Sequence, residues 1–296
     1  MTPEVSALHD ALERSGYVAD PAVATALFLA TDLQKPLLIE GDAGVGKTET
    51  AKALAAALGA ELIRLQCYEG LDAATALYEW NYPRQLLHVR IAEREGAGAA
   101  DVEQEIFGRA YLLERPLLRA ITRPRSPVLL VDEIDRADDG FEAFLLELLS
   151  DWQVTIPELG TVRAEHAPHV VLTSNRTREI GDALRRRCLY LWLEHPDLDK
   201  EVRIIRRRVP EASAGLAGEV ARFVQALRRR RLVKMPGVAE SIDWAQALAR
   251  LGREHLDADT ALETLGCVLK DRGDLADLGR GEVEPLVGEG GAGATP

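Results

Sequence analysis

The feature that most constrains this chain is a glycine-rich stretch that directly follows an apolar run. Residues 36–50 read PLLIEGDAGVGKTET, in which 41–48 match the pattern GxxxxGK[ST]. The apolar run 36–40 predicts a buried strand, and the spacing of 47–58 predicts a helix. Glycines between a strand and a helix let backbone N–H groups converge on phosphate oxygens, because no Cβ atom intrudes. The stretch therefore predicts a nucleotide phosphate loop, and this strand–loop–helix context disfavours a chance glycine-rich turn.

Two side chains of this loop have expected roles of their own. Lys47 is expected to reach the β- and γ-phosphates, and Thr48 is expected to ligate Mg²⁺. The helix that begins at Lys47 adds its positive N-terminal dipole. The residues predicted to bind the nucleotide are Gly41, Asp42, Ala43, Gly44, Val45, Gly46, Lys47, Thr48, Glu49 and Asp132.

An acidic pair ends a second apolar run, in the stretch VLLVDEIDRAD at 128–138. Asp132 lies at the predicted strand's carboxyl end, where it can hold the hydration shell of Mg²⁺ together with Thr48. Glu133 projects one position further and can orient and deprotonate the attacking water. Asp135 and Asp138 are interpreted as acids at the start of a helix.

A polar residue also ends the apolar run HVVLTSN at 169–175. The amide of Asn175 can hydrogen-bond both the γ-phosphate and the attacking water. Asparagine at the end of a strand is also a common turn residue, so this signal is weak without the other two motifs.

The alternation of apolar and helical segments predicts an α/β fold with a mostly parallel sheet and helices on both faces. Five short apolar runs predict buried strands, and they lie at 36–40, 61–67, 127–133, 169–175 and 188–194. Helical stretches separate the strands, at 47–58, 101–121, 139–150 and 178–187. The predicted organisation is a nucleotide-binding core at 1–195, a small all-helical domain at 196–278 and a disordered, glycine-rich tail at 279–296.

Two additions to simple alternation are predicted within the core. The stretch at 153–165 reads as a hairpin turned at Glu158-Leu159-Gly160. The surplus chain at 68–100 reads as an insertion with its own structure, rich in the aromatic residues Tyr68, Tyr78, Trp80 and Tyr82. These rings either anchor a partner protein or cover the insertion's own small core.

Composition excludes several classes of protein. The formal charge of −12 argues against wholesale binding to nucleic acid or to an anionic membrane. The basic run RRRRLVK at 228–234 is interpreted as a solvated helix end. No apolar stretch approaches the roughly 18 residues of a membrane span, and the N-terminus does not resemble a signal peptide. Three widely spaced cysteines predict reduced thiols in a cytoplasmic protein.

Together these motifs resemble an AAA+ ATPase, with a P-loop NTPase core followed by a helical lid domain. The hairpin, the insertion and the stretch LQCYEGLDAATALYEWNYPRQLL at 65–87 resemble the MoxR family. The similarity is to members linked to maturation of carbon monoxide dehydrogenase and related molybdenum enzymes. It implies ATP and Mg²⁺ as cofactors and a hexameric ring of identical subunits. It also implies a client protein, such as a molybdenum hydroxylase, and a von Willebrand factor A-domain partner.

The resemblance also assigns a role to an arginine in GDALRRRCLY at 181–190. In the family, the arginine directly before the last strand enters the neighbouring subunit's site. That position corresponds to Arg187, with Arg186 as the second candidate, although three arginines also suit a solvated helix end. One departure is the stretch VKMPGVAESIDWAQAL, where family members often carry a sensor arginine after the proline. This sequence has no arginine there, which leaves Glu240 or Lys234 as candidates for a different role.

Three functions remain open at this point. The first is an ATP-driven remodeller that assembles or activates a partner protein, as the resemblance implies. The second is a DNA-directed motor subunit, which the acidic charge disfavours. The third is a nucleotide-dependent assembly scaffold without turnover, which the intact set of Asp132, Glu133 and Asn175 disfavours.

Overall fold

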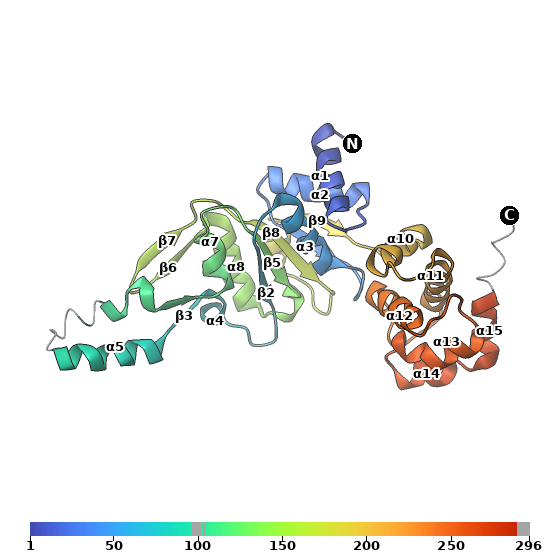
Figure 1. Ribbon diagram of the computed structural model, residues 1–296. Coiled ribbons are helices and arrows are strands. Elements are labelled where there is room, and N and C mark those ends of the chain that lie inside the picture. The colour runs from blue at the N-terminus through green and yellow to red at the C-terminus, as the bar shows by residue number, and fades with distance from the viewer. Residues whose placement is uncertain (96–101, 103–104, 289–296) are drawn as a thin grey trace. The chain divides into compact units, whose positions relative to one another are not determined.

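The computed structural model describes residues 1–95, 102 and 105–288 (Figure 1). Contacts divide the chain into two compact units. The first, here the α/β unit, comprises Met1–Ser15, Ala19–Glu40 and Thr48–Trp192. The second, here the helical unit, comprises Gly16–Val18, Gly41–Lys47 and Leu193–Pro296. The phosphate loop therefore groups with the helical part of the chain, whereas the strand before it belongs to the α/β unit.

A five-stranded parallel sheet forms the centre of the α/β unit, in the order β2-β5-β8-β1-β9. Its strands are β1 (Leu37–Glu40), β2 (Leu62–Gln66), β5 (Val128–Asp132), β8 (His169–Ser174) and β9 (Leu189–Trp192). Each lies within one of the five predicted apolar runs, so the predicted parallel α/β fold is confirmed. Because β1, β5 and β8 are parallel neighbours, their carboxyl ends meet at one edge of the sheet.

Helices cover both faces of this sheet. Alternate strand residues such as Leu129 and Val131 share a buried cluster with α7 (Pro116–Ile121) and α8 (Asp139–Asp151). On β1, β8 and β9 the sheet contacts α2 (Pro21–Asp32), and α1 (Pro3–Arg14) packs on α2. The helix after the phosphate loop is α3 (Lys47–Leu58). Burial on both faces explains why the strands read as continuous apolar runs rather than alternating ones.

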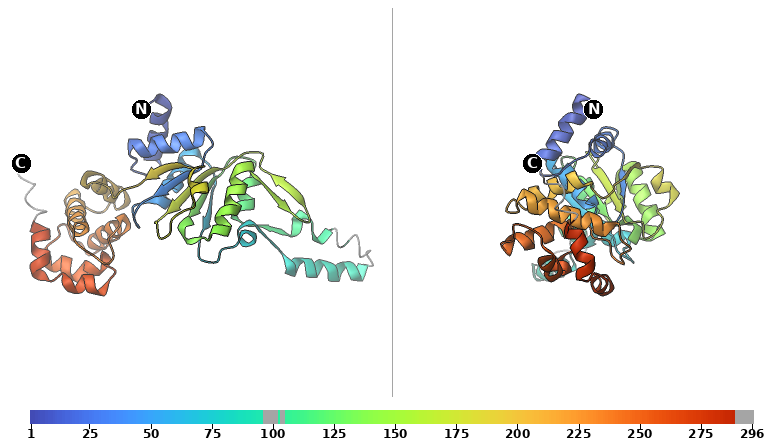
Figure 2. Two further views of the ribbon diagram at one scale, coloured as in Figure 1. Left: turned by 180° about the vertical axis from the view of Figure 1, so that it is seen from behind. Right: turned by 90° about the vertical axis from the view of Figure 1, so that its right-hand side faces the viewer.

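The predicted insertion is a small subdomain of the α/β unit. It contains α4 (Ala73–Leu77), β3 (Tyr78–Trp80), α5 (Tyr82–Glu95), η1 (Arg109–Tyr111) and β4 (Leu112–Glu114). Strand β3 pairs antiparallel with β4, so the inserted structure continues beyond residue 100. The prediction of one helix over 101–121 is wrong, because β4 occupies part of it; residues 96–101, 103 and 104 lie outside the described residues. Figures 1 and 2 show α5 extending away from the sheet.

The aromatic residues of the insertion divide between core and surface. The side chain of Trp80 is buried and packs edge-on against Phe107, with ring centroids 5.4 Å apart, and against Tyr78 at 6.1 Å. Tyr68 and Tyr82 are exposed instead. The interpretation of Trp80 as a partner anchor is therefore wrong, because its ring completes the core between β3 and the chain before β4.

We expect replacement of Trp80 by alanine to destabilise the chain by about 3 kcal/mol, since it leaves a large cavity in a packed core. The free energy of unfolding, measured by urea titration, checks this value. Tyr82→Ala is the matched control, because this neighbouring ring is 60% exposed and its loss removes little buried surface. Equal stability of the two variants would contradict the assignment of Trp80 to the core.

Two further predictions for the α/β unit have different outcomes. The hairpin is present as β6 (Gln153–Ile156) paired antiparallel with β7 (Gly160–Arg163). The helix predicted over 178–187 shrinks to α9 (Asp182–Arg185), because tertiary contacts hold the chain before it. The Glu142 carboxylate accepts the N–H of Gly181 at 2.9 Å, and Arg178 Nη2 donates to the carbonyl of Ala137 at 2.6 Å.

The helical unit is a bundle with its own core (Figure 2). Its helices are α10 (Leu198–Arg208), α11 (Ala214–Arg228), α12 (Val238–Arg250), α13 (Ala258–Thr264), η3 (Leu265–Cys267), α14 (Arg272–Asp277) and α15 (Arg280–Gly288). Phe223 and Trp244 meet edge-on in the centre, with centroids 5.0 Å apart.

The predicted disordered tail is wrong for its first part. Helix α15 occupies Arg280–Gly288, and its Val283 and Leu286 are buried in the core of the helical unit. The remainder of the predicted tail, 289–296, lies outside the described residues. No helix in the described part of the chain has both the length and the apolarity that crossing a membrane requires.

Candidate functional site

The phosphate loop runs from Gly41 to the first residue of α3, Lys47. The ammonium of Lys47 is buried over the loop and donates to the carbonyls of Gly41 at 2.7 Å and Asp42 at 2.6 Å. A side chain at Gly41 is excluded, because its Cβ would lie 2.2 Å from the carbonyl oxygen of Leu193. Gly44 adopts a φ of +79°, which an L-residue with a side chain rarely accepts.

The start of α12 touches this loop through backbone atoms within the helical unit. The N–H of Val238 donates to the carbonyl of Gly44 at 2.9 Å. A Cβ on Gly237 would lie 2.6 Å from Gly44 Cα, so no larger residue fits. The Glu240 carboxylate accepts the N–H of Gly237 at 2.9 Å and thereby caps its own helix. The close contact between the loop and the start of α12 is therefore made by two glycines, Gly44 and Gly237.

Asp132 is the centre of the polar site in the α/β unit. Its carboxylate is 2% exposed and accepts the hydroxyl of Thr48 at 3.0 and 3.2 Å. The hydroxyl of Thr173, on the neighbouring strand β8, donates to the same carboxylate at 2.5 Å. The structure thus brings together Thr48 and Asp132, two residues 84 positions apart that were predicted to share a metal ion.

Arg64 joins this site and was missed by the sequence reasoning. From β2 its Nε and Nη2 donate to one oxygen of Asp132, at 3.0 and 2.6 Å. The guanidinium also donates to Gln66. The available signal was a single arginine inside the apolar run ELIRLQC. The pairing offsets the cost of burying the Asp132 charge.

The hydroxyl of Thr48 and the carboxylate of Asp132 are the hard oxygen donors that suit Mg²⁺. Within the described residues no group of three or more His, Cys, Asp or Glu side chains could hold a metal ion.

Glu133 follows Asp132 in a strained backbone conformation, with φ +56° and ψ +50°. Its N–H donates to the hydroxyl of Thr173 at 3.0 Å, which holds this turn against β8. The Glu133 carboxylate is partly exposed and lies 3.2 Å from Nε of Arg136. A left-handed backbone conformation at a residue with a side chain often marks a functional position.

Asn175 lies directly after β8, and Asp135 holds its backbone. The buried Asp135 carboxylate accepts the N–H of Asn175 at 3.2 Å and that of Thr177 at 2.9 Å. The hydroxyl of Thr177 donates to it as well, at 2.6 Å. Asp135 therefore does more than start a helix, whereas Asp138 does cap α8, accepting the N–H of Phe141 at 2.8 Å.

Three consecutive arginines lie at the end of α9, and their surroundings differ. Arg185 donates to Glu40 at 2.8 Å. Arg186 is exposed, and the exposed Arg187 donates from Nη1 to the carbonyl of Leu146 in α8 at 3.1 Å. Arg186 and Arg187 are therefore at the surface of the α/β unit.

The thiol of Cys67 is buried close to the carboxylates of this site. Burial, followed by the charges of Asp132, Asp135 and Glu133, raises the pKa of Cys67 to about 12. Its N–H donates to the carbonyl of Asp132 at 2.8 Å. The thiol is therefore protonated at neutral pH and is no nucleophile.

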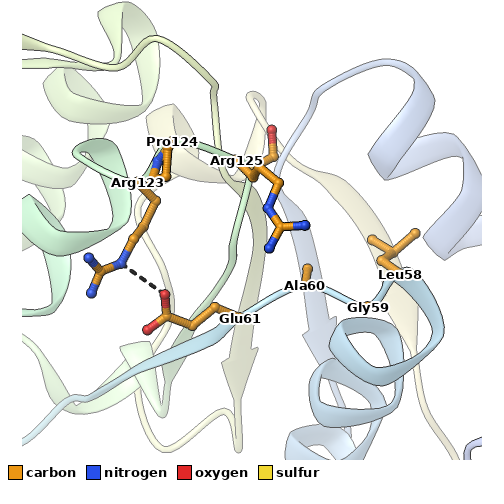
Figure 3. A pocket seen from close by; sticks show the side chains of 8 residues that line it. Leu58, Gly59, Ala60, Glu61, Arg123, Pro124 and Arg125 are labelled. Carbon is orange, nitrogen blue, oxygen red and sulfur yellow. Dashed lines mark ion pairs between the residues drawn. The ribbon is translucent and has the colours of Figure 1, made fainter.

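A pocket of about 370 Å³ lies away from these residues (Figure 3). Arg123 pairs there with Glu61, Nε to Oε2 at 2.8 Å, and Arg125 lies on the same wall. Glu61 precedes β2, so the pocket is at the amino end of the strand whose carboxyl end meets Asp132. Because β2 and β5 are parallel, this pocket is not part of the polar site.

Known proteins are similar to this chain over most of its length. Residues 36–188 match the family model described as AAA domain (dynein-related subfamily). Gas vesicle ATPase GvpN of Haloferax mediterranei is 24% identical over 86% of this chain and 74% of its own length. Chaperone protein ClpB of Streptomyces albus G is 26% identical over 96% of this chain. This chain spans 32% of that ClpB and 4% of Midasin of Giardia intestinalis, which is 23% identical.

Among solved structures, a variant of Thermotoga maritima RuvB has a TM-score of 0.52 at 17% identity. The match covers 87% of this chain and 71% of that one. At this identity the likeness concerns the fold alone. It agrees with a parallel sheet flanked by helices and followed by a helical part.

Proposed function

The chain belongs to the AAA domain family (dynein-related subfamily) and is an AAA+ ATPase, and we propose that it uses ATP hydrolysis to assemble or activate a partner protein. The observation that carries the proposal is the Asp132 centre. It joins the helix after the phosphate loop, through Thr48, to the turn that bears Glu133. A scaffold that only binds nucleotide has no need of an acidic residue in a strained backbone conformation at this strand end.

The proposed chemistry assigns one role to each residue. Mg²⁺ held by Thr48 and Asp132 would supply charge neutralisation at the β- and γ-phosphates. Lys47 and the loop N–H groups bind these phosphates, and Glu49 lies in the first turn of the same helix. Glu133 accepts the proton of the attacking water, and the Asn175 amide orients that water.

The proposed active unit is a ring of identical subunits, hexameric by resemblance to MoxR proteins. Arg187, or Arg186 beside it, completes the site of the next subunit. Two features support this: both guanidinium groups are exposed, and Arg185 is engaged inside its own subunit. A positive charge at the transferring phosphate accelerates hydrolysis by about 10³–10⁵ in related phosphoryl-transfer enzymes.

The proposed client is a protein, as in MoxR members that act on molybdenum enzymes, with a von Willebrand factor A-domain protein as a further partner. The name of one relative, a chaperone, supports action on a protein client. A cytoplasmic location belongs to the same proposal, supported by three free cysteines. The formal charge of −12 favours a protein client over DNA.

An ATPase assay tests this function directly. We expect measurable basal hydrolysis that added DNA leaves unchanged and that a cognate molybdenum hydroxylase changes. Stimulation by DNA would favour a nucleic-acid motor instead. Nucleotide binding without turnover would favour the scaffold.

Mixing two inactive variants tests the proposed site between subunits. Arg187→Ala subunits retain a sound phosphate loop, and Lys47→Ala subunits retain a sound arginine. We expect each variant alone to be nearly inactive and the mixture to regain part of the wild-type rate, because some interfaces pair a sound loop with a sound arginine. Hydrolysis is measured as phosphate release at fixed total protein.

The control is assembly of the mixture, followed by mass photometry of differently tagged subunits. Mixed rings that recover no activity would contradict the role of Arg187. Full activity of Arg187→Ala alone would contradict it as well, and Arg186→Ala would then take its place in the same experiment.

A further inference from the structure

Glu40 is a buried carboxylate at the last position of β1, directly before the phosphate loop. It is 3% exposed, although burying a charge is costly unless partners satisfy it. Its Oε2 accepts from Arg185 Nη2 at 2.8 Å and from the hydroxyl of Tyr190 at 3.0 Å. Nε of Arg176 lies 3.9 Å from the same oxygen. An apolar residue would suit this sheet position better, so the charge calls for an explanation.

The partners of Glu40 come from three segments of the α/β unit. Arg176 directly follows Asn175, Arg185 ends α9, and Tyr190 lies on β9. Aromatic rings hold both guanidinium groups: Arg185 lies over Tyr190, 5.7 Å from the centroid, and Arg176 lies over Trp192 at 5.6 Å. Backbone pairing places Glu40 beside Ser174 and Trp192. The cluster therefore connects the ends of β8, β1 and β9.

Helix α9 has four residues, and its Leu184 is buried in the core of the α/β unit, while Arg185 ties its last residue to Glu40. The ion pair joins Glu40, one residue before the phosphate loop, to Arg185, one residue before the two exposed arginines. A shift of the loop's first residues would displace Glu40 and, through the ion pair, the end of α9. Arg185 is meanwhile unavailable to a neighbouring subunit.

We propose that Glu40 is a positioning residue that, through Arg185, couples the phosphate loop of one subunit to Arg186 and Arg187, which the same subunit presents to its neighbour. The proposal rests on the proposed function, in which these arginines act in the next subunit's site. Glu40 then influences hydrolysis in two places. Along the chain it fixes the end of β1 that leads into its own loop, which affects the rate of hydrolysis but not the affinity for ATP, and through α9 it supports the neighbour's reaction.

The test separates the second effect from the first. Arg187→Ala subunits, with sound loops, are mixed with subunits that carry both Lys47→Ala and Glu40→Gln. In this mixture Glu40→Gln is present only in subunits whose own loop is already inactive. We expect the recovered hydrolysis to fall at least about tenfold below that of the mixture with native Glu40, because misplacement of a reacting group by ~1 Å costs about 10²-fold. Glu61→Gln is the matched control, since its carboxylate pairs with Arg119 and Arg123 at the opposite end of β2.

Recovery that Glu40→Gln leaves unchanged would overturn the proposal, because Glu40 would then serve its own loop alone. Failure of the mixture with native Glu40 would instead overturn the arginine assignment itself, so the two failures are distinguishable. If Glu40→Gln subunits do not enter rings, Arg185→Gln takes their place and is judged by the same two outcomes. ATP affinity of Glu40→Gln subunits with intact Lys47 supplies a second readout. We expect it to stay within about twofold of wild type, whereas a purely structural role would lower it together with the melting temperature.

Discussion

Replacing Glu133 by glutamine is expected to lower the rate of ATP hydrolysis by about 10²–10⁴-fold while leaving ATP binding intact. Glutamine keeps the shape of the side chain and loses the group that accepts a proton from water. The turn that bears this side chain is held by the N–H of Glu133, which donates to the Thr173 hydroxyl, and does not depend on the carboxylate. Bound ATP should therefore accumulate, and the proposed assembly of subunits should be favoured.

The rate is measured as phosphate release, and bound nucleotide is identified after rapid gel filtration. Asp139→Asn is the matched control, because this carboxylate lies nearby in the chain but is fully exposed beside Arg178, and its loss should change the rate by less than about twofold. Normal turnover of Glu133→Gln would show that another group accepts the proton. Asp135 would be a poor substitute, since its oxygens already accept the N–H groups of Asn175 and Thr177.

Replacing Lys47 by alanine should abolish measurable ATP binding, with a loss in affinity of at least about 100-fold. Charge-assisted hydrogen bonds contribute about 1.5–3 kcal/mol each, and 1.4 kcal/mol corresponds to about tenfold in affinity. The Lys47 ammonium is buried over the loop and donates to the carbonyls of Gly41 and Asp42, so its removal also leaves these acceptors without their donor. Isothermal titration calorimetry with ATP measures the affinity.

Lys52→Ala provides the control for loss of one positive charge on the same helix. Lys52 lies one turn further along α3 and pairs with Glu49 on an exposed surface. Its replacement should leave the affinity nearly unchanged, because exposed pairs contribute little. An undiminished affinity of Lys47→Ala would contradict the assignment of the phosphate loop.

The parallel sheet could be predicted from sequence because its signals are local. Each strand is a short, uninterrupted apolar run that ends in polar residues, as in VLLVDE at 128–133. Burial on both faces produces such runs, and a parallel sheet then gathers their carboxyl ends at one edge. This is why Thr48 and Asp132 could be expected to lie together. The structures of the insertion and of the tail were harder to predict from sequence, because a few apolar residues, such as Val283 and Leu286, do not reveal which core they join.

The long-range ion pairs could not be predicted. Arg64 reaches Asp132 across 68 residues, and Glu40 reaches Arg185 across 145. A charged residue in a strand indicates that some partner exists, but its identity depends on strand order. The same holds for Asp135, whose position in the sequence suggests a helix start and whose contacts lie 40 and 42 residues away.

The sequence by itself determined the strands, the phosphate loop and the acidic pair, because each depends on backbone geometry and burial within about ten residues. The tertiary structure alone decided which charges meet. It joined Arg64 to Asp132, tied Arg185 to Glu40, and left Arg186 and Arg187 exposed on the same short helix end. The physical reason is that a buried charge takes whichever partner the folded sheet brings within about 3 Å, and that choice is set by strand order and register rather than by neighbours along the chain.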